Sequence, residues 1–142
     1  MKRTAYWVLA GLLAAGIVIS GCSAPAPAAK EEAVHVEKQD SGLSVLTLSQ
    51  HAAERLGVQT GEVREDGTRT VIPYAAIIYD KTGATWAYAT SEPLVFQRAA
   101  ITVETISGDE AVLSDGPPAG TLVVTVGAAE LYGAETGVGG GH

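Results

Sequence analysis

The chain has 142 residues, with nine Lys and Arg against sixteen Asp and Glu, and a net charge of −7. This length favours a single folded domain. The acidic balance argues against nucleic acid as a partner and against electrostatic adhesion to anionic lipid, because both depend on Lys and Arg. The single cysteine, Cys22, excludes an intramolecular disulfide.

The N-terminus has the pattern of an export signal. Two basic residues at positions 2 and 3 precede an uncharged apolar run over residues 5–19, and the small residues Ser20 and Gly21 stand directly before Cys22. A charged start, an apolar centre and a small-residue cleavage site are the three parts of a secretory signal peptide. We therefore predict that residues 1–21 are a signal peptide.

The run Ile19-Ser20-Gly21-Cys22 resembles the lipobox of bacterial lipoproteins. The resemblance implies that Cys22 is acylated, by palmitate or similar chains, and becomes the first residue of an extracytoplasmic protein anchored to the cell membrane. In a cell with two membranes, the anchor lies in the periplasmic face of the inner or the outer one. The alternative is an uncleaved transmembrane helix over residues 5–21. Such a helix would span roughly 25 Å, short of a hydrocarbon core of about 30 Å.

Residues 22–42 are predicted to be the lipidated cysteine and a disordered tether. Alternating Ala and Pro after Ser23 favour extended polyproline-like conformations. The remainder is rich in Lys and Glu and carries too little apolar surface to fold.

Residues 43–135 are predicted to form an all-β domain with one short helix, a small β-sandwich or barrel. Short β-rich runs alternate here with turn signals every eight to twelve residues. The helix is predicted to begin after a Ser49 cap and to end at Leu56, with Gly57 as a left-handed stop. Asp-Gly within 65–67 and the turn residues 80–83 favour hairpins. Pro73 is expected at a strand start or bulge, and residues 136–142 as a flexible Gly-rich tail. The predicted strands are 44–48, 58–64, 68–72, 74–79, 85–90, 94–98, 100–106, 111–113 and 122–126.

Several motifs follow one another in this domain. They are Ile72-Pro73-Tyr74-Ala75-Ala76-Ile77, Gly83-x-x-Trp86-Ala87-Tyr88, Phe96-Gln97-Arg98-x-x-Ile101-x-Val103 and Gly116-Pro117-Pro118-Ala119-Gly120-Thr121. Together with the opening segment, Leu48-Ser49-x-x-Ala52-x-x-x-Leu56-Gly57-Val58, they resemble the membrane-proximal domain of periplasmic adaptor subunits of RND efflux pumps. These adaptors are also called membrane fusion proteins, and the heavy-metal type is the most similar. The resemblance covers about residues 46–135.

In that family the matching pieces rest against the periplasmic face of the pump. A β-barrel, a lipoyl-like domain and usually an α-hairpin separate them in the sequence, whereas here residues 63–70 join them directly. The resemblance implies a lipid-anchored, non-enzymatic, adaptor-like module without the lipoyl and hairpin domains. It would serve transmembrane export of metal ions or small molecules, with an RND transporter or a full-length adaptor as partner. We expect a monomer in solution, because most ring-forming domains are missing.

Few residues have a pattern typical of catalysis or metal binding. Ser49, His51 and Glu54 lie close in sequence, but we interpret them as a solvated helix face and expect neither an enzyme nor a cofactor. His35 and His142 are weak candidates for metal ligands, since no cluster has metal-ligand spacing. The alternative function is therefore a free-standing lipoprotein that binds a metal or a small ligand.

The aromatic residues leave two interpretations open. Trp86 and Tyr88 lie on the same face of the predicted strand. They either fill the core or, with Tyr132, dock on a partner, because aromatic side chains are enriched in interface cores. Arg98 is interpreted as an edge-strand charge that discourages aggregation.

Overall fold

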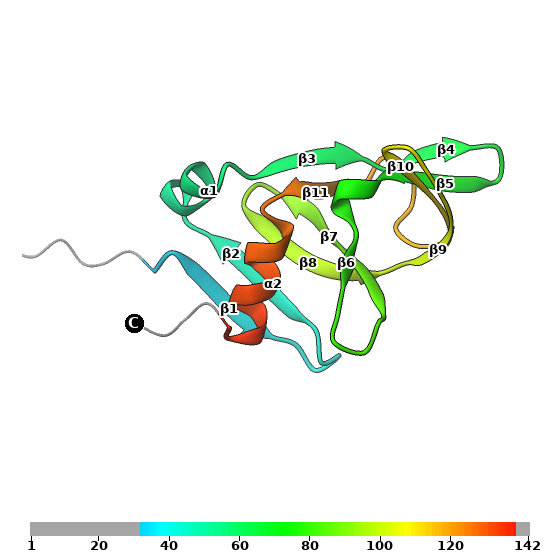
Figure 1. The fold of residues 1–142 in the computed structure, drawn as a ribbon. Helices are drawn as coiled ribbons and strands as arrows, with labels where there is room; N and C mark the ends of the chain where they lie inside the picture. The colour runs from blue at the N-terminus through cyan, green and yellow to red at the C-terminus, as the bar shows by residue number, and fades with distance from the viewer. Residues whose placement is uncertain (1–31, 139–142) are drawn as a thin grey trace, which may run out of the picture. The chain divides into compact units, whose positions relative to one another are not determined.

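The computed structural model describes residues 32–138, which form two antiparallel sheets and two α-helices (Figure 1). The prediction of an all-β domain is therefore confirmed. The longer sheet has the order β1 (Val34–Lys38), β2 (Ser44–Leu48), β8 (Val95–Ala100), β7 (Thr85–Glu92), β11 (Leu122–Val126) and β3 (Gln59–Glu62), with β6 (Ile78–Tyr79) beside β7. The shorter sheet has the order β4 (Arg64–Asp66), β5 (Arg69–Pro73), β10 (Glu110–Asp115) and β9 (Thr102–Ser107).

The first helix, α1 (Gln50–Leu56), begins and ends where its capping residues predict. The Ser49 hydroxyl accepts a hydrogen bond from the Ala52 N–H at 3.2 Å, and Gly57 adopts a left-handed conformation with φ 61°. The second helix, α2 (Ala128–Thr136), was not predicted. Its sequence, AAELYGAET, is dominated by small and polar residues, so no apolar stripe marks it as a helix.

The longer sheet is buried on both faces at its centre. In β7, Ala87 belongs to a cluster between the two sheets, whereas Tyr88 belongs to a cluster under the helices. In β11, Val123 and Val124 divide in the same way, because successive strand side chains point to opposite faces. Both clusters lie within residues 32–138, so this part of the chain has its own core.

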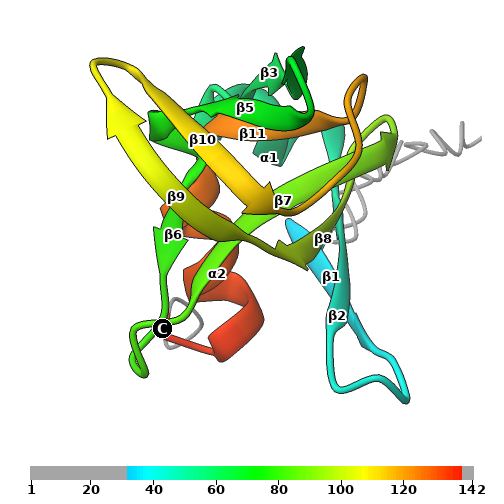
Figure 2. The ribbon, with the colours of Figure 1, turned by 90° about the vertical axis from the view of Figure 1, so that its right-hand side faces the viewer.

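Two single residues carry the chain from one sheet to the other. Val63 stands between β3 and β4, and Ile101 stands between β8 and β9, a bend that is visible in Figure 2. Both side chains are buried in the cluster between the sheets. The Val63 N–H donates to the Thr121 carbonyl at 2.8 Å, and the Ile101 N–H donates to the Thr85 carbonyl at 3.1 Å. These corners are therefore hydrogen-bonded and hold the two sheets face to face.

The predicted tether extends too far, because residues 34–38 form strand β1. This strand pairs with β2 in a register that places Val36 opposite Leu46. Val34 and Val36 pack against the cluster under the helices. The Lys- and Glu-rich composition of the segment concealed this alternation, since only two apolar side chains are needed to hold a five-residue edge strand.

The predicted strand 74–79 is also wrong over its first half. Residues Tyr74–Ala76 form a 3-10 turn, and only Ile78–Tyr79 pair with β7. The Tyr74 N–H donates to the Asp109 carbonyl at 2.8 Å, and the Ile77 N–H donates to the Tyr74 carbonyl at 3.1 Å. Pro73 is the last residue of β5, not the first of a strand. The turn is required because the chain must leave the shorter sheet and join the longer one.

We predict that Gly61→Ala destabilises the domain, because the new Cβ would lie 2.7 Å from Pro73 Cγ, in a rigid ring. The expected loss is about 1–3 kcal/mol in the free energy of unfolding. Gly133→Ala is the matched control, since a Cβ there meets no atom within 4 Å. It should stabilise α2 by up to about 1 kcal/mol. Urea denaturation of both variants checks the signs, and a loss of stability in both would contradict this account.

Candidate functional site

A buried ion pair joins α2 to the longer sheet. Arg98 Nε, from β8, lies 2.7 Å from Glu135 Oε2, near the end of α2. The side chains are 14% and 4% exposed. The guanidinium also lies over two aromatic rings, 4.5 Å from the centroid of Trp86 and 5.6 Å from that of Tyr132. Cations within about 6 Å of a ring centroid are attracted by it, so three separate groups hold the Arg98 charge.

Tyr88 completes the cluster from the neighbouring strand. It lies directly opposite Arg98 in the register of β7 and β8, and its hydroxyl donates to Glu135 Oε2 at 2.5 Å. Burial of the ring, together with the adjacent carboxylate, raises the pKa of Tyr88 far above its usual value. The phenol therefore stays protonated and acts as a hydrogen-bond donor.

This arrangement overturns the interpretation of Arg98 as an edge-strand charge. Strand β8 is internal, because β2 and β7 pair with its two edges. A signal for this was present in the sequence, since Phe96 is two residues earlier and its side chain belongs to the cluster under the helices. Residues two apart share a strand face, so Arg98 points to the same side. Its partner Glu135 was not identified from the sequence.

The structure brings together the three aromatic residues that the sequence singled out. Tyr88 is fully buried and cannot present its ring to a partner. Trp86 and Tyr132 are only partly buried, and both of their rings lie close to the Arg98 guanidinium. The core interpretation therefore holds for Tyr88, and the docking interpretation remains a proposal for Trp86 and Tyr132.

A hydrogen-bonded turn fixes the outer edge of Trp86. The indole Nε1 donates to Asp80 Oδ2 at 3.0 Å, in the hairpin between β6 and β7. The other oxygen, Asp80 Oδ1, accepts from the Thr82 hydroxyl at 2.6 Å, the Thr82 N–H at 2.8 Å and the Ala84 N–H at 3.0 Å. These bonds, the Thr82 hydroxyl foremost, lower the pKa of Asp80 from 3.8 to about 2.

The other predicted candidates make local contacts. Ser49 caps α1, Glu54 accepts from Gln50 Nε2 at 2.9 Å, and His51 is exposed. His35 Nδ1 lies 3.5 Å from Glu32 Oε2, with both side chains largely exposed. Cys22 and His142 lie outside the described residues.

Within residues 32–138, no group of three or more His, Cys, Asp or Glu side chains is arranged to hold a metal ion. In the same part of the chain, no helix is long and apolar enough to cross a membrane.

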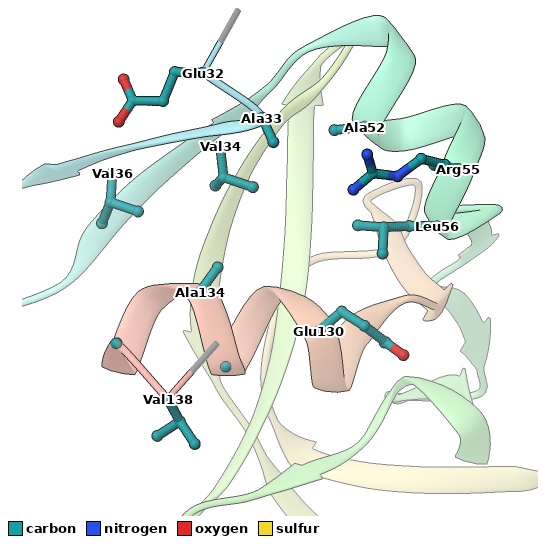
Figure 3. A pocket seen from close by; sticks show the side chains of 12 residues that line it. Glu32, Ala33, Val34, Val36, Ala52, Arg55, Leu56, Glu130, Ala134 and Val138 are labelled. Carbon is teal, nitrogen blue, oxygen red and sulfur yellow. The ribbon is translucent and has the colours of Figure 1, made fainter. Parts of the chain in front are cut away.

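An open groove of about 560 Å³ lies between β1, α1 and α2 (Figure 3). Its walls are mainly apolar: Val34 and Val36 point from β1 towards Ala134 of α2, and Leu56 comes from α1. The charged side chains that line it are Glu32, Arg55 and Glu130. Sequence reasoning missed this groove, because it assigned one entire wall to the tether.

Comparison of the chain with models of protein families, with curated proteins and with solved structures finds no match. The resemblance to efflux adaptors therefore rests on the motifs and their order alone.

We predict that Glu135→Ala lowers the free energy of unfolding by about 3 kcal/mol, because it leaves Arg98 buried without its carboxylate and Tyr88 without an acceptor. Glu104→Ala is the matched control. Glu104 pairs with Arg69, but both side chains are about half exposed, so the loss should stay below about 1 kcal/mol. Urea unfolding followed by the fluorescence of Trp86 measures both losses. Equal losses would show that the buried pair contributes no more than a surface one.

The Asp80 turn should weaken in acid. Because the fold lowers the pKa of Asp80 to about 2, its contribution to stability is present above the unfolded value of 3.8 and is lost as the pH falls towards 2. Asp80→Asn places an amide N–H against either the Trp86 indole or the turn donors, so it should lower the melting temperature at neutral pH. The difference between the wild-type protein and this variant should shrink near pH 2. A difference that is constant with pH would contradict the assignment.

Proposed function

We propose that the protein is a lipid-anchored, non-enzymatic, adaptor-like module that associates with an RND-type efflux system, for the export of metal ions or small molecules. It would lack the lipoyl and hairpin domains of full adaptors. It would act by docking on the transporter or on a full-length adaptor.

The main support for this proposal is that the two pieces of the domain are joined directly. In the family that the chain resembles, inserted domains separate the two pieces of the membrane-proximal domain. Here β3 pairs with β11, with Glu62 opposite Leu122, so the opening and closing segments lie side by side. The connection that follows β3 is the β4–β5 hairpin, which places Glu65 opposite Thr70 and turns at Gly67. A tight hairpin thus occupies the position from which inserted domains would extend.

The length of the tether limits where the module can dock. The structure starts strand β1 at Val34, so the tether is shorter than its composition predicts. Residues 23–33 can reach at most about 40 Å when fully extended. An acylated Cys22 would therefore keep the module close to the membrane surface, as a partner at the periplasmic face of a transporter requires.

The rim of the Arg98 cluster supplies a candidate docking surface. Trp86 and Tyr132 are partly exposed, and their contacts with Arg98 hold both rings in place. Aromatic and Arg side chains are enriched in interfaces, and a fixed ring loses little conformational entropy on binding.

Affinity capture of the lipidated protein from its own membrane tests the proposal. We expect a tagged protein in mild detergent to recover an RND transporter or adaptor component, identified by mass spectrometry. Cys22→Ser should leave the domain folded but abolish membrane localisation after salt washing, and it should lose the partner. Ser23→Ala is the matched control and should retain both. Capture of the lipidated protein without any transporter or adaptor component would contradict the proposal.

A further inference from the structure

We infer that the outer edge of β1 pairs with the same edge of a second copy of this chain, so that the longer sheet continues across a two-fold axis. Among the described strands, β2 is the only one that pairs with β1, and the opposite edge of β1 has no strand beside it. An unpaired strand edge is a template for another strand. Three properties of β1 favour its own antiparallel copy.

The first property is the direction of the peptide groups. The Ser49 N–H donates to the Ala33 carbonyl at 3.1 Å, and the Gln39 N–H donates to the Leu43 carbonyl at 2.8 Å. Hydrogen-bonded and non-hydrogen-bonded pairs alternate along an antiparallel ladder, so the odd-numbered residues 33–39 turn their peptide groups towards β2. The outer edge therefore presents the peptide N–H and C=O groups of Val34, Val36 and Lys38. In an antiparallel copy centred on Val36, these outward residues meet one another.

The second property is the charge pattern in that register. His35 lies opposite Glu37 of the second copy, and the two-fold axis repeats the pair. An imidazole can donate a hydrogen bond to a carboxylate whether it is neutral or protonated. A shift of the register by two residues in either direction also pairs the outward peptide groups. One of these shifted registers places His35 opposite His35 of the second copy, and the other places Glu37 opposite Glu37. Complementary hydrogen-bonding side chains thus select one register.

The third property is the groove on the other face of β1. Val34 and Val36 form one wall of it, Ala134 lies opposite, and Val138 at its border is 85% exposed (Figure 3). Edge pairing would place Val36 of the second copy beside Val36, so the apolar wall would continue into the second chain. The same pairing therefore fills the unpaired edge and brings the apolar walls of the two grooves together.

Five residues make a short edge, so the association should be weak in dilute solution, where we expect a monomer. Confinement to a membrane raises the effective concentration of the copies and favours the pair. The effect of membrane confinement rests on the proposed lipid anchor, whereas the inferred register of the two strands does not.

Cysteine cross-linking tests the register. The soluble chain from Ser23 contains the whole described domain and no cysteine, since Cys22 is the only one. His35→Cys and Glu37→Cys are made as separate proteins with tags of different size, mixed at high concentration and mildly oxidised. The inferred register places these positions in a non-hydrogen-bonded pair, with Cα atoms about 4.5 Å apart, within disulfide range. We expect the mixed dimer to form several-fold faster than either protein cross-links to itself.

Lys38→Cys mixed with His35→Cys is the matched control, because these side chains lie on opposite faces of the strand. Sedimentation equilibrium is the second measurement. It compares the association of variants in which the side chains at positions 35 and 37 are changed in charge. His35→Glu should weaken association several-fold, and the double variant His35→Glu/Glu37→Lys should restore it. Circular dichroism confirms that each variant is folded.

A mixed pair no faster than the control pair, or a double variant that fails to restore association, would overturn the inference. Purification of the soluble chain as a monomer at high concentration with an apolar small molecule in the groove would overturn it too. Because this assay uses neither lipid nor transporter, its failure leaves the proposed function standing. Failure of membrane capture likewise leaves the register untouched.

Discussion

The buried carboxylate of Glu135 constrains the rest of the domain most strongly. With only 4% of its side chain exposed, it would be costly in the interior without partners. Arg98 and Tyr88 supply them, and these two residues lie directly opposite each other on neighbouring strands. A slip of one residue in either strand would turn one of them to the other face. The position of α2 and the register of β7 and β8 therefore depend on each other.

The shorter sheet forms a second layer against the longer sheet. The chain passes from one sheet to the other at two corners, Val63 and Ile101. Each corner is one buried residue between a strand of the longer sheet and a strand of the shorter one. The strands at the centre are buried on both faces, so the tight β4–β5 hairpin closes a domain that needs no further layer for its core.

The unpaired edge of β1 and the apolar groove lie beside each other in the domain. The outer edge of β1 and the groove beside it lie next to Glu32, where the described part of the chain begins. Pairing between copies would use the edge of β1, whereas docking would use the side chains of Trp86 on β7 and Tyr132 on α2.

The sequence by itself determined the elements whose causes are local. Ser49 and Gly57 set the two ends of α1, the turn over residues 80–83 set one hairpin, and the alternating runs set β2, β7 and β11 within a few residues. Only the tertiary structure decided the strand at residues 34–38, the helix α2 and the pairing of Arg98 with Glu135. Each of these depends on groups far apart in the chain: β1 needs a cluster to cover its two valines, and α2 needs an ion pair that spans the sequence from β8 to its own last turn. Local propensity carries no information about such partners, because their energy appears only when the layers meet.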